Sequence, residues 1–272
     1  IVDPVVCGVA QLGIDHQAFL GDTLAQIAAE KAGIAKAGAP LVTQRYPESL
    51  FPVMEAAAEK AGTRWIGQGD GWDAATYRDR LHYRDAQGRL DTPLPRLAGA
   101  HQVQNAALAF AMLRHQAAVS LSEAAIKAAP LWAQWPARLQ RLDHGPLLAP
   151  LPAGTSAWLD GGHNAGAGEA IAAYFTAERL EGGKLHLIIG MLANKDHRAL
   201  VDPLAASIAS ITAVPVPGHE CHPASMYGEN VREAADVAEA LRALPDDGLP
   251  VLIAGSLYLA GDVLRLSGAL PD

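Results

Sequence analysis

Lys31 is the first residue whose type and position indicate chemistry. A helix is predicted over 23–32, because Leu24, Ile27 and Ala28 form an apolar stripe at helical spacing. Lys31 occupies the next position of that stripe and should face inward, where a lysine tends to lose its proton. Its amine can extend to solvent or pair with a carboxylate. Alternatively, the neutral amine can take up carbon dioxide, and the resulting carbamate is an oxygen ligand suited to Mg²⁺.

Asp160 and His163 lie where a predicted strand meets a predicted helix. The strand expected over 157–160 ends in Asp160, and the run Asp-Gly-Gly-His-Asn at 160–164 permits a tight turn before the helix. Open parallel sheets bind ligands at the carboxyl ends of their strands, and helix N-termini favour anions. The same run is equally compatible with an ordinary turn in which Asn164 caps the helix.

Two further junctions of this kind occur in the second half of the chain. One spans 190–196 and includes Lys195, and the other spans 254–258 and includes Ser256. Each is unremarkable alone, but three polar strand ends in one small domain favour a binding edge.

His16 and Asn105 occupy comparable places in the first half. His16 lies in the loop after the strand predicted over 5–9, although an isolated histidine is usually a simple surface residue. Asn105 falls on the second turn of a helix predicted over 101–118. Its neighbours are small residues, which would let a flat ligand approach the helix. Close packing of that helix through its alanines explains the same pattern.

The elements that must position these residues alternate between apolar strands and amphipathic helices, which predicts an α/β fold with a mostly parallel sheet. Strands are expected at 5–9, 40–43, 64–66, 81–84, 157–160, 185–190, 211–214 and 250–254. Helices are expected at 23–32, 48–61, 101–118, 122–129, 165–180, 196–208, 230–244 and 257–267. The stretch 67–99 breaks the alternation and is expected to form an antiparallel insertion or edge strands. Prolines and tryptophans indicate a domain boundary near 130–136.

Composition limits the class of protein. The chain has 272 residues, of which 50% are hydrophobic, and this allows one large domain or two of ordinary size. A net charge of −8 argues against a nucleic-acid partner, and no apolar run is long enough to span a membrane. Two cysteines are too few for a disulfide framework, so a reduced, cytoplasmic setting is expected. The chain contains no G-x-x-x-x-G-K-[ST] phosphate loop, no zinc-type Cys/His spacing and no G-x-S-x-G motif.

Taken in order, these segments resemble the folylpolyglutamate synthase/dihydrofolate synthase family, a branch of the Mur ligase superfamily. The most specific stretches are Glu-Lys-Ala-Gly-Ile at 30–34 and Asp-Gly-Gly-His-Asn at 160–164. Further matching stretches lie at 12–16, 20–24, 101–107, 135–139, 190–196 and 255–259. The match covers essentially the whole chain.

The resemblance implies a P-loop ATPase domain followed by a smaller Rossmann-like domain. Residues 1–134 would be the C-terminal part of the central ATPase domain, and residues 135–272 would be the Mur ligase C-terminal domain. The implied activity is an ATP-dependent ligation of L-glutamate to dihydropteroate, folate or both through an acyl phosphate. The phosphate-binding loop and most of the folate pocket are expected upstream of Ile1, so the chain is expected to be inactive alone.

The resemblance also implies roles for individual residues. By position, His16 is a magnesium ligand and Lys31 is a carbamylated lysine that binds the same ion. Asn105, Arg138 and Asp160 are implied as contacts of the nucleotide.

The remaining implied roles concern glutamate and catalysis. His163 and Ser256 match contacts in the glutamate subsite, and Lys31, His163 and Lys195 are the expected catalytic residues. ATP and Mg²⁺ are the expected cofactors. The expected partners are small molecules only, with no nucleic acid or membrane, and the protein is expected to be a monomer.

Two other functions share part of this pattern. A peptidoglycan-precursor Mur ligase has the same reaction and domain plan, but the 160–164 run and the spacing from Asp15 to Lys31 favour the folate branch. A non-catalytic nucleotide-binding module on the same scaffold would lack a phosphate loop upstream of Ile1.

Overall fold

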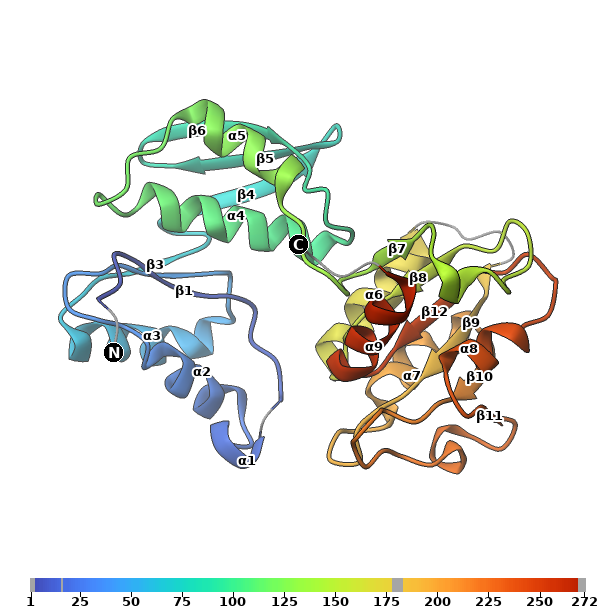
Figure 1. Cartoon of the computed structure of the whole chain (residues 1–272). Helices are drawn as coiled ribbons and strands as arrows, with labels where there is room; N and C mark the ends of the chain where they lie inside the picture. The colour runs from blue at the N-terminus through green and yellow to red at the C-terminus, as the bar shows by residue number, and fades with distance from the viewer. Residues whose placement is uncertain (1–2, 16, 178–182, 269–272) are drawn as a thin grey trace. The chain divides into compact units, whose positions relative to one another are not determined.

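The computed structural model describes residues 3–15, 17–177 and 183–268, which fall into two compact units (Figure 1). Unit 1 comprises Ile1–Arg96 and Ala100–Gln134, and unit 2 comprises Leu97–Gly99 and Trp135–Asp272. Each unit buries its own clusters of apolar side chains and therefore has a core of its own.

Unit 1 is built on a three-stranded parallel sheet in the order β1–β2–β3. Its elements are β1 (Cys7–Val9), α1 (Gln17–Leu20), α2 (Leu24–Ala32), β2 (Leu41–Thr43), a 3-10 turn η1 (Glu48–Leu50), α3 (Phe51–Ala61) and β3 (Trp65–Gly67). Neighbouring residues of a strand face opposite sides of the sheet. Leu41 accordingly packs with the cluster formed by α2 and α3, whereas Val42 packs with the cluster that contains α4.

An antiparallel sheet completes unit 1. Its elements are β4 (Trp72–Tyr77), β5 (Arg80–Asp85) and β6 (Gly88–Pro93), followed by α4 (Ala100–Arg114) and α5 (Glu123–Trp132). Arg78 and Asp79 form the two-residue turn between β4 and β5, and both have positive φ, as the primed turns of hairpins require. Helix α4 contacts β1 and β2 on one side and β4 and β5 on the other, while α5 packs on β6 (Figure 1).

A buried ion pair fixes the end of α4 to β5. Arg114 donates two hydrogen bonds of 2.7 Å to the carboxylate of Asp85, and the Tyr83 hydroxyl donates a third at 3.0 Å. The side chain of Asp85 is 0% exposed. Burial alone would raise the pKa of Asp85, but the hydrogen bonds from Arg114, the Gln87 N–H and Tyr83 outweigh it and hold the pKa below its ordinary value.

Unit 2 contains a six-stranded sheet in the order β11–β10–β9–β12–β8–β7. All neighbouring pairs are parallel except β7 with β8. The strands are β7 (Gln140–Leu142), β8 (Ala157–Leu159), β9 (Leu185–Ile189), β10 (Ile208–Ala213), β11 (Arg232–Glu233) and β12 (Val251–Ala254). The carboxyl ends of the five parallel strands therefore share one edge of the sheet.

Helices cover both faces of this sheet. They are α6 (Ala165–Ala177), α7 (Arg198–Leu204), α8 (Val237–Arg242) and α9 (Leu257–Ser267), with 3-10 turns η2 (Pro146–Leu148), η4 (Ala205–Ser207) and η5 (Ala224–Tyr227). Leu187 and Leu252 pack with α6 and α7, whereas Ile188 and Ile253 pack with α8 and α9. This is the doubly wound arrangement in which ligands bind outside the carboxyl ends of the strands.

The predicted α/β fold and the antiparallel insertion within 67–99 are confirmed. The helix predicted over 230–244 is wrong in its first half, which contains β11. Helix α8 begins only after Asp236, whose carboxylate accepts a 2.7 Å hydrogen bond from the N–H of Glu239. An aspartate in this capping position fixes the start of a helix because it satisfies a backbone donor that has no partner within the helix.

The helix predicted over 196–208 is shorter than expected. Helix α7 ends at Leu204, η4 follows, and β10 begins at Ile208 rather than at residue 211. Pro203 lies in the last turn of α7, where its nitrogen has no N–H to donate to the carbonyl of Ala199. Among the described residues, no helix has the length and apolarity that a membrane crossing requires.

Candidate functional site

Three side-chain amides form a hydrogen-bonded row at the carboxyl end of β2 in unit 1. Gln44 directly follows β2, and its Nε2 donates a 3.2 Å hydrogen bond to Oδ1 of Asn105 on α4. Nδ2 of Asn105 donates in turn to Oε1 of Gln102, also at 3.2 Å. Gln44 and Gln102 are 6% and 7% exposed, whereas Asn105 is exposed. Asn105, the predicted nucleotide contact, therefore lies beside the carboxyl end of β2 and is held by two buried partners.

Lys31 lies in the last turn of α2, on the face where Ile27, Ala28 and Ala32 are fully buried. The predicted inward face is confirmed, but the lysine itself is only half-buried. Partial exposure is compatible with an amine that extends to solvent and with one that carbon dioxide can reach. Carbamylation of Lys31 therefore stays a prediction. His16, the other expected magnesium ligand, lies outside the described residues.

Asp160 directly follows β8 in unit 2 and is 5% exposed. Its carboxylate accepts a 2.7 Å hydrogen bond from the N–H of Leu139 and a 2.6 Å hydrogen bond from the N–H of Gly162. A carboxylate taken out of water needs such donors to offset the loss of hydration. Asp160 thus connects the end of β8 to the chain segment before β7 and shapes the turn that carries His163. Contact with a nucleotide stays a prediction.

Arg138 stands between two residues in left-handed backbone conformations. The φ angles are 55° for Ala137 and 43° for Leu139, and each such non-glycine residue costs roughly 1–2 kcal/mol. Surrounding bonds hold this shape: Gln140 Oε1 accepts from the Ala137 N–H at 2.9 Å, and the Ala137 carbonyl accepts from the Gly161 N–H at 3.0 Å. The Arg138 guanidinium folds back onto the Ala137 carbonyl at 3.2 Å. Strain of this kind gathers at functional sites.

His163 and Asn164 occupy the turn between β8 and α6. Nδ1 of His163 lies 2.9 Å from the carbonyl oxygen of Gly161 and donates to it, which leaves Nε2 on the other side of the ring. Asn164 Oδ1 accepts a 2.9 Å hydrogen bond from the N–H of Ala167, so the capping role that the sequence allowed for Asn164 is confirmed.

Ser256 is 3% exposed and is the N-cap of α9, where its hydroxyl accepts a 3.1 Å hydrogen bond from the N–H of Tyr258. A contact of Ser256 with glutamate stays a prediction beside this structural role. Gly255 precedes it with a φ of 114°, and a Cβ there would lie 2.8 Å from the carbonyl oxygen of Gly190. A glycine at 255 therefore lets the ends of β12 and β9 approach closely.

Lys195 lies in the loop that follows β9 and is half-buried. Nε2 of His222 donates a 2.7 Å hydrogen bond to the Lys195 carbonyl, and the N–H of His222 donates to the Met191 carbonyl at 3.0 Å. The loop is thus fixed from the far side by the segment after β10. His219 of that segment lies against the ring of Tyr258, with 3.9 Å between ring centroids.

The structure brings the unit 2 candidates to one edge. Asp160, His163, Lys195 and Ser256 follow the carboxyl ends of β8, β9 and β12, which are neighbours in the sheet. Arg138 joins them through Gly161, since a Cβ on that glycine would lie 3.3 Å from Arg138 Nη1 and would overlap Leu257 of α9. Lys31 and Asn105 belong to unit 1.

Gln44 and His222 are not among the residues that the sequence indicated, and Gln102 belongs to the matching stretch 101–107 but was given no role of its own. The rule that identified Asp160, a polar residue immediately after an apolar strand, would also have identified Gln44, which follows the strand predicted over 40–43. His222 carries no comparable local signal, because its partner Lys195 lies in another loop, whereas Gln102 and its partner Asn105 lie on the same helix α4.

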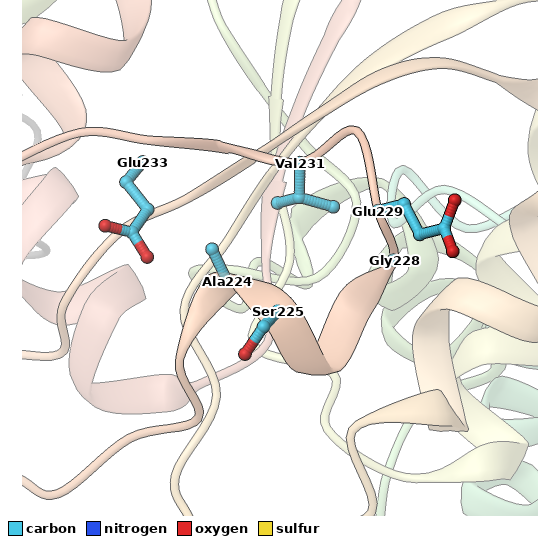
Figure 2. Close-up of a pocket in the computed structure, with 6 residues that line it drawn as sticks. All are labelled: Ala224, Ser225, Gly228, Glu229, Val231 and Glu233. Atoms are coloured by element: carbon cyan, nitrogen blue, oxygen red, sulfur yellow. The ribbon is translucent and has the colours of Figure 1, made fainter.

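A pocket of about 450 Å³ lies elsewhere in unit 2, beside the edge strand β11 (Figure 2). Its lining consists of Ala224, Ser225, Gly228, Glu229, Val231 and Glu233. Two carboxylates and no basic group line this pocket, so it is unsuited to phosphates or to the carboxylates of an amino acid.

A metal centre would require several ligating side chains to converge. Within 3–15, 17–177 and 183–268, no three His, Cys, Asp or Glu side chains gather closely enough to hold a metal ion. Mg²⁺ requires near-octahedral oxygen ligands. The described residues therefore do not supply a complete magnesium site.

Known proteins resemble this chain over nearly its whole length. No protein-family model matches it. Folylpolyglutamate synthase of Lacticaseibacillus casei is 31% identical over 284 residues, covering 97% of this chain and 62% of that protein. Dihydrofolate synthase/folylpolyglutamate synthase of Bacillus subtilis is 24% identical over 97% of this chain and 63% of its own length. The chain thus spans about three fifths of the length of these two relatives.

Solved structures agree. Escherichia coli FolC in complex with DHPP and ADP superposes with a TM-score of 0.84 at 26% identity, covering 98% of this chain and 62% of that one. An FPGS–AMPPCP–folate complex superposes with a TM-score of 0.77 at 29% identity, covering 97% of this chain and 62% of that one. With the fold, the motif stretches and these relatives in agreement, the chain belongs to the folylpolyglutamate synthase/dihydrofolate synthase family.

Proposed function

We propose that this chain supplies nucleotide- and glutamate-binding residues to an ATP-dependent ligase. The ligase adds L-glutamate to dihydropteroate, folate or both through an acyl phosphate. The observation that carries the proposal is the gathering of Arg138, Asp160, His163 and Ser256 at one strand edge of unit 2, in a chain homologous to such ligases. Residues 1–134 are assigned to the central ATPase domain and residues 135–272 to the C-terminal domain.

Each unit contributes a different kind of contact. In unit 1, the neutral amide of Asn105 suits a nucleotide base, since a base offers hydrogen-bond donors and acceptors but no charge. In unit 2, Arg138 offers a guanidinium, which binds phosphate in a forked geometry, and Asp160 shapes the loop around it. ATP supplies the phosphoryl group that activates the carboxylate.

The chemistry explains the need for basic groups. Phosphoryl transfer to a carboxylate brings two anions together, so cationic side chains and positioned donors must spread the developing charge. Lys195 and Arg138 are cationic side chains of unit 2 suited to this task. Nε2 of His163 is the acceptor nitrogen of the ring when Nδ1 donates to Gly161, so it is suited to accept a proton. His163 and Ser256 are assigned to the glutamate subsite, where the amine must be held in line with the acyl carbon.

Mg²⁺ is proposed as the partner of the ATP phosphates, and His16 and Lys31 as two of its ligands. A lysine amine is not itself a magnesium ligand, so this role of Lys31 requires the carbamate. The described residues form no complete site for this ion. A monomeric state, a cytoplasmic location and small molecules as the only partners complete the proposal. The two free cysteines fit a reducing compartment.

The function is tested on the full-length protein that carries this chain. Purified protein is incubated with ATP, labelled L-glutamate and either dihydropteroate or a reduced folate. The expected result is ADP release that depends on both glutamate and the pterin, with one amide formed per ADP. A UDP-muramyl substrate in place of the pterin serves as the control and should give no ADP. Turnover with that substrate alone would assign the protein to the peptidoglycan branch, and no ADP with any acceptor would refute the ligase assignment.

A further inference from the structure

The hydrogen bonds between Gln44, Asn105 and Gln102 have a defined direction. Gln44 donates to the oxygen of Asn105, and the nitrogen of Asn105 donates to the oxygen of Gln102. A primary amide has two acceptor lone pairs and two N–H donors. After these two bonds, Asn105 retains one lone pair and one N–H, and it is the only exposed member of the three.

Both partners of Asn105 lie on rigid elements. The N–H of Gln44 donates to the carbonyl of Val9 at 3.3 Å, which fixes it between the ends of β1 and β2. Gln102 is buried in the first turn of α4, a helix that packs against both of those strands. The two buried glutamines hold the Asn105 amide with its oxygen toward Gln44 and its nitrogen toward Gln102.

We infer that Gln44 and Gln102 are positioning residues that orient the Asn105 amide so that it selects adenine over 6-oxopurine nucleotides. The inference rests on the proposed contact between Asn105 and the nucleotide. Adenine presents an N–H donor at N6 beside an acceptor at N1 or N7, which matches an amide oxygen beside an amide N–H. Hypoxanthine and guanine present the reverse order on their Watson–Crick edge, an acceptor at O6 beside a donor at N1.

A matched pair of substitutions separates this role from a merely structural one. A carboxylate accepts hydrogen bonds but donates none. Gln102→Glu keeps an acceptor where Asn105 already donates, so the orientation of the amide is preserved. Gln44→Glu places an acceptor where the Asn105 oxygen needs a donor. The Asn105 amide must then turn over, so that its nitrogen takes the place of its oxygen. Both changes introduce the same group at nearly equal burial.

The experiment measures kcat/KM for ATP and for inosine triphosphate in the full-length protein, at about pH 8.5 so that the introduced carboxylates are ionised. A matched pair of base contacts is worth about 1–3 kcal/mol, or roughly 5- to 150-fold in discrimination. Gln44→Glu should therefore lower the ratio of kcat/KM for ATP to that for inosine triphosphate by about fivefold or more. Gln102→Glu should leave the ratio within about threefold of the unsubstituted protein.

The outcomes distinguish the inference from the function on which it rests. Asn105→Ala should raise the KM for ATP and reduce the ratio, and no change in either would refute the nucleotide contact itself. If Asn105→Ala reduces the ratio but the two glutamate variants change it equally, the contact stands and the orienting role is wrong. Gln44→Glu could also lower kcat/KM equally for both nucleotides and leave the ratio unchanged. That result would refute the orienting role of Gln44 and assign it a structural role only.

Discussion

Asp85 in unit 1 and Asp160 in unit 2 are both buried carboxylates, yet they are held in different ways. Asp85 pairs with the guanidinium of Arg114, at the junction of β5 and α4 and away from the carboxyl ends of the parallel strands. Asp160 accepts its two short hydrogen bonds from backbone N–H groups of Leu139 and Gly162, at the edge where the candidate residues gather.

The difference separates stability from function. A carboxylate whose charge is neutralised by a neighbouring side chain fixes two elements to each other. A carboxylate held by backbone N–H groups fixes the shape of two loops, and these loops carry Arg138 and His163. Substitutions at Asp85 should therefore change only the free energy of unfolding. Substitutions at Asp160 should lower both the free energy of unfolding and the rate of turnover.

The largest effect is expected for Asp85→Ala. The substitution leaves the guanidinium of Arg114 without its partner in a site where that side chain is 14% exposed. Breaking a buried pair in this way costs about 3–5 kcal/mol in the free energy of unfolding. Denaturant unfolding followed by tryptophan fluorescence measures it. The exposed pair of Lys127 and Glu123 is the control, and Lys127→Gln should cost less than about 1 kcal/mol. Equal costs for the two variants would refute the structural role of Asp85.

Asp160→Ala should have the next largest effect on stability. Two buried N–H groups lose their acceptor, and each unsatisfied group costs about 1–3 kcal/mol. Ligase turnover should also fall when it is measured at a temperature where the variant is still folded, so the loss cannot be attributed to unfolding. Asp143→Ala, which removes an exposed ion pair with Arg141, is the control. Normal turnover in folded Asp160→Ala would show that the two loops keep their shape without the carboxylate.

The pH dependence of stability should report the Asp85 cluster in two stages. Burial lowers the pKa of His115 from its ordinary value, and the charges of Arg64 and Arg114 lower it further against the opposing effect of Asp85. Both His115 and Asp85 have depressed pKa values in the folded state, so each contributes stability that is lost as the pH falls. The first loss should begin near pH 6.5 and the second below about pH 4, with a slope of at most about 1.4 kcal/mol per pH unit for each group.

Unfolding measured across this pH range tests the assignment. His115→Gln should abolish the upper stage and leave the lower one, because the remaining groups with a lowered pKa, Asp85 among them, are carboxylates that titrate at lower pH. An unchanged upper stage in that variant would mean that another group is responsible.

The smallest effect is expected for Ala137→Gly, and its sign is opposite. Glycine adopts the left-handed conformation at residue 137 without the steric cost that alanine bears. Relief of strain should stabilise the folded protein by up to about 1 kcal/mol. The greater flexibility of the unfolded chain and the loss of the buried Ala137 methyl group offset part of this gain. Arg138 should be held less firmly, so kcat should fall while stability is unchanged or higher. A parallel loss of both would argue against stored strain at this loop.

Much of the fold could be predicted because its signals are local. Apolar runs followed by capped, amphipathic segments predicted the strands near 41–43, 157–159 and 251–254 and the helices near 24–32 and 257–267. The error at 230–244 arose because helical periodicity continues upstream of the point where Asp236 starts the helix. Strands β4, β6 and β7 were not predicted individually, since they are defined by their hairpin partners rather than by apolar content.

The candidate site was predictable to the same extent. Polar residues at strand ends, together with the resemblance to a known family, were sufficient to identify Arg138, Asp160, His163, Lys195 and Ser256 as candidates. Their hydrogen bonds were not predictable, and Ser256 and Asn164 prove to cap helices. The pairing of Leu139 with Asp160 joins residues 21 positions apart, across two strands whose adjacency is not encoded locally.

The sequence by itself determined the alternation of strands and helices, the three polar strand ends of the second half and the family, because each depends on residue type at short spacing. Only the tertiary structure decided which distant side chains meet. Gln44 contacts Asn105 because α4 packs against the end of β2, although 61 positions separate the two residues. β12 returns to lie between β8 and β9, and this placement brings Ser256 beside Asp160. The order of strands in a sheet is set by the packing of the whole chain, and no local pattern of residues specifies it.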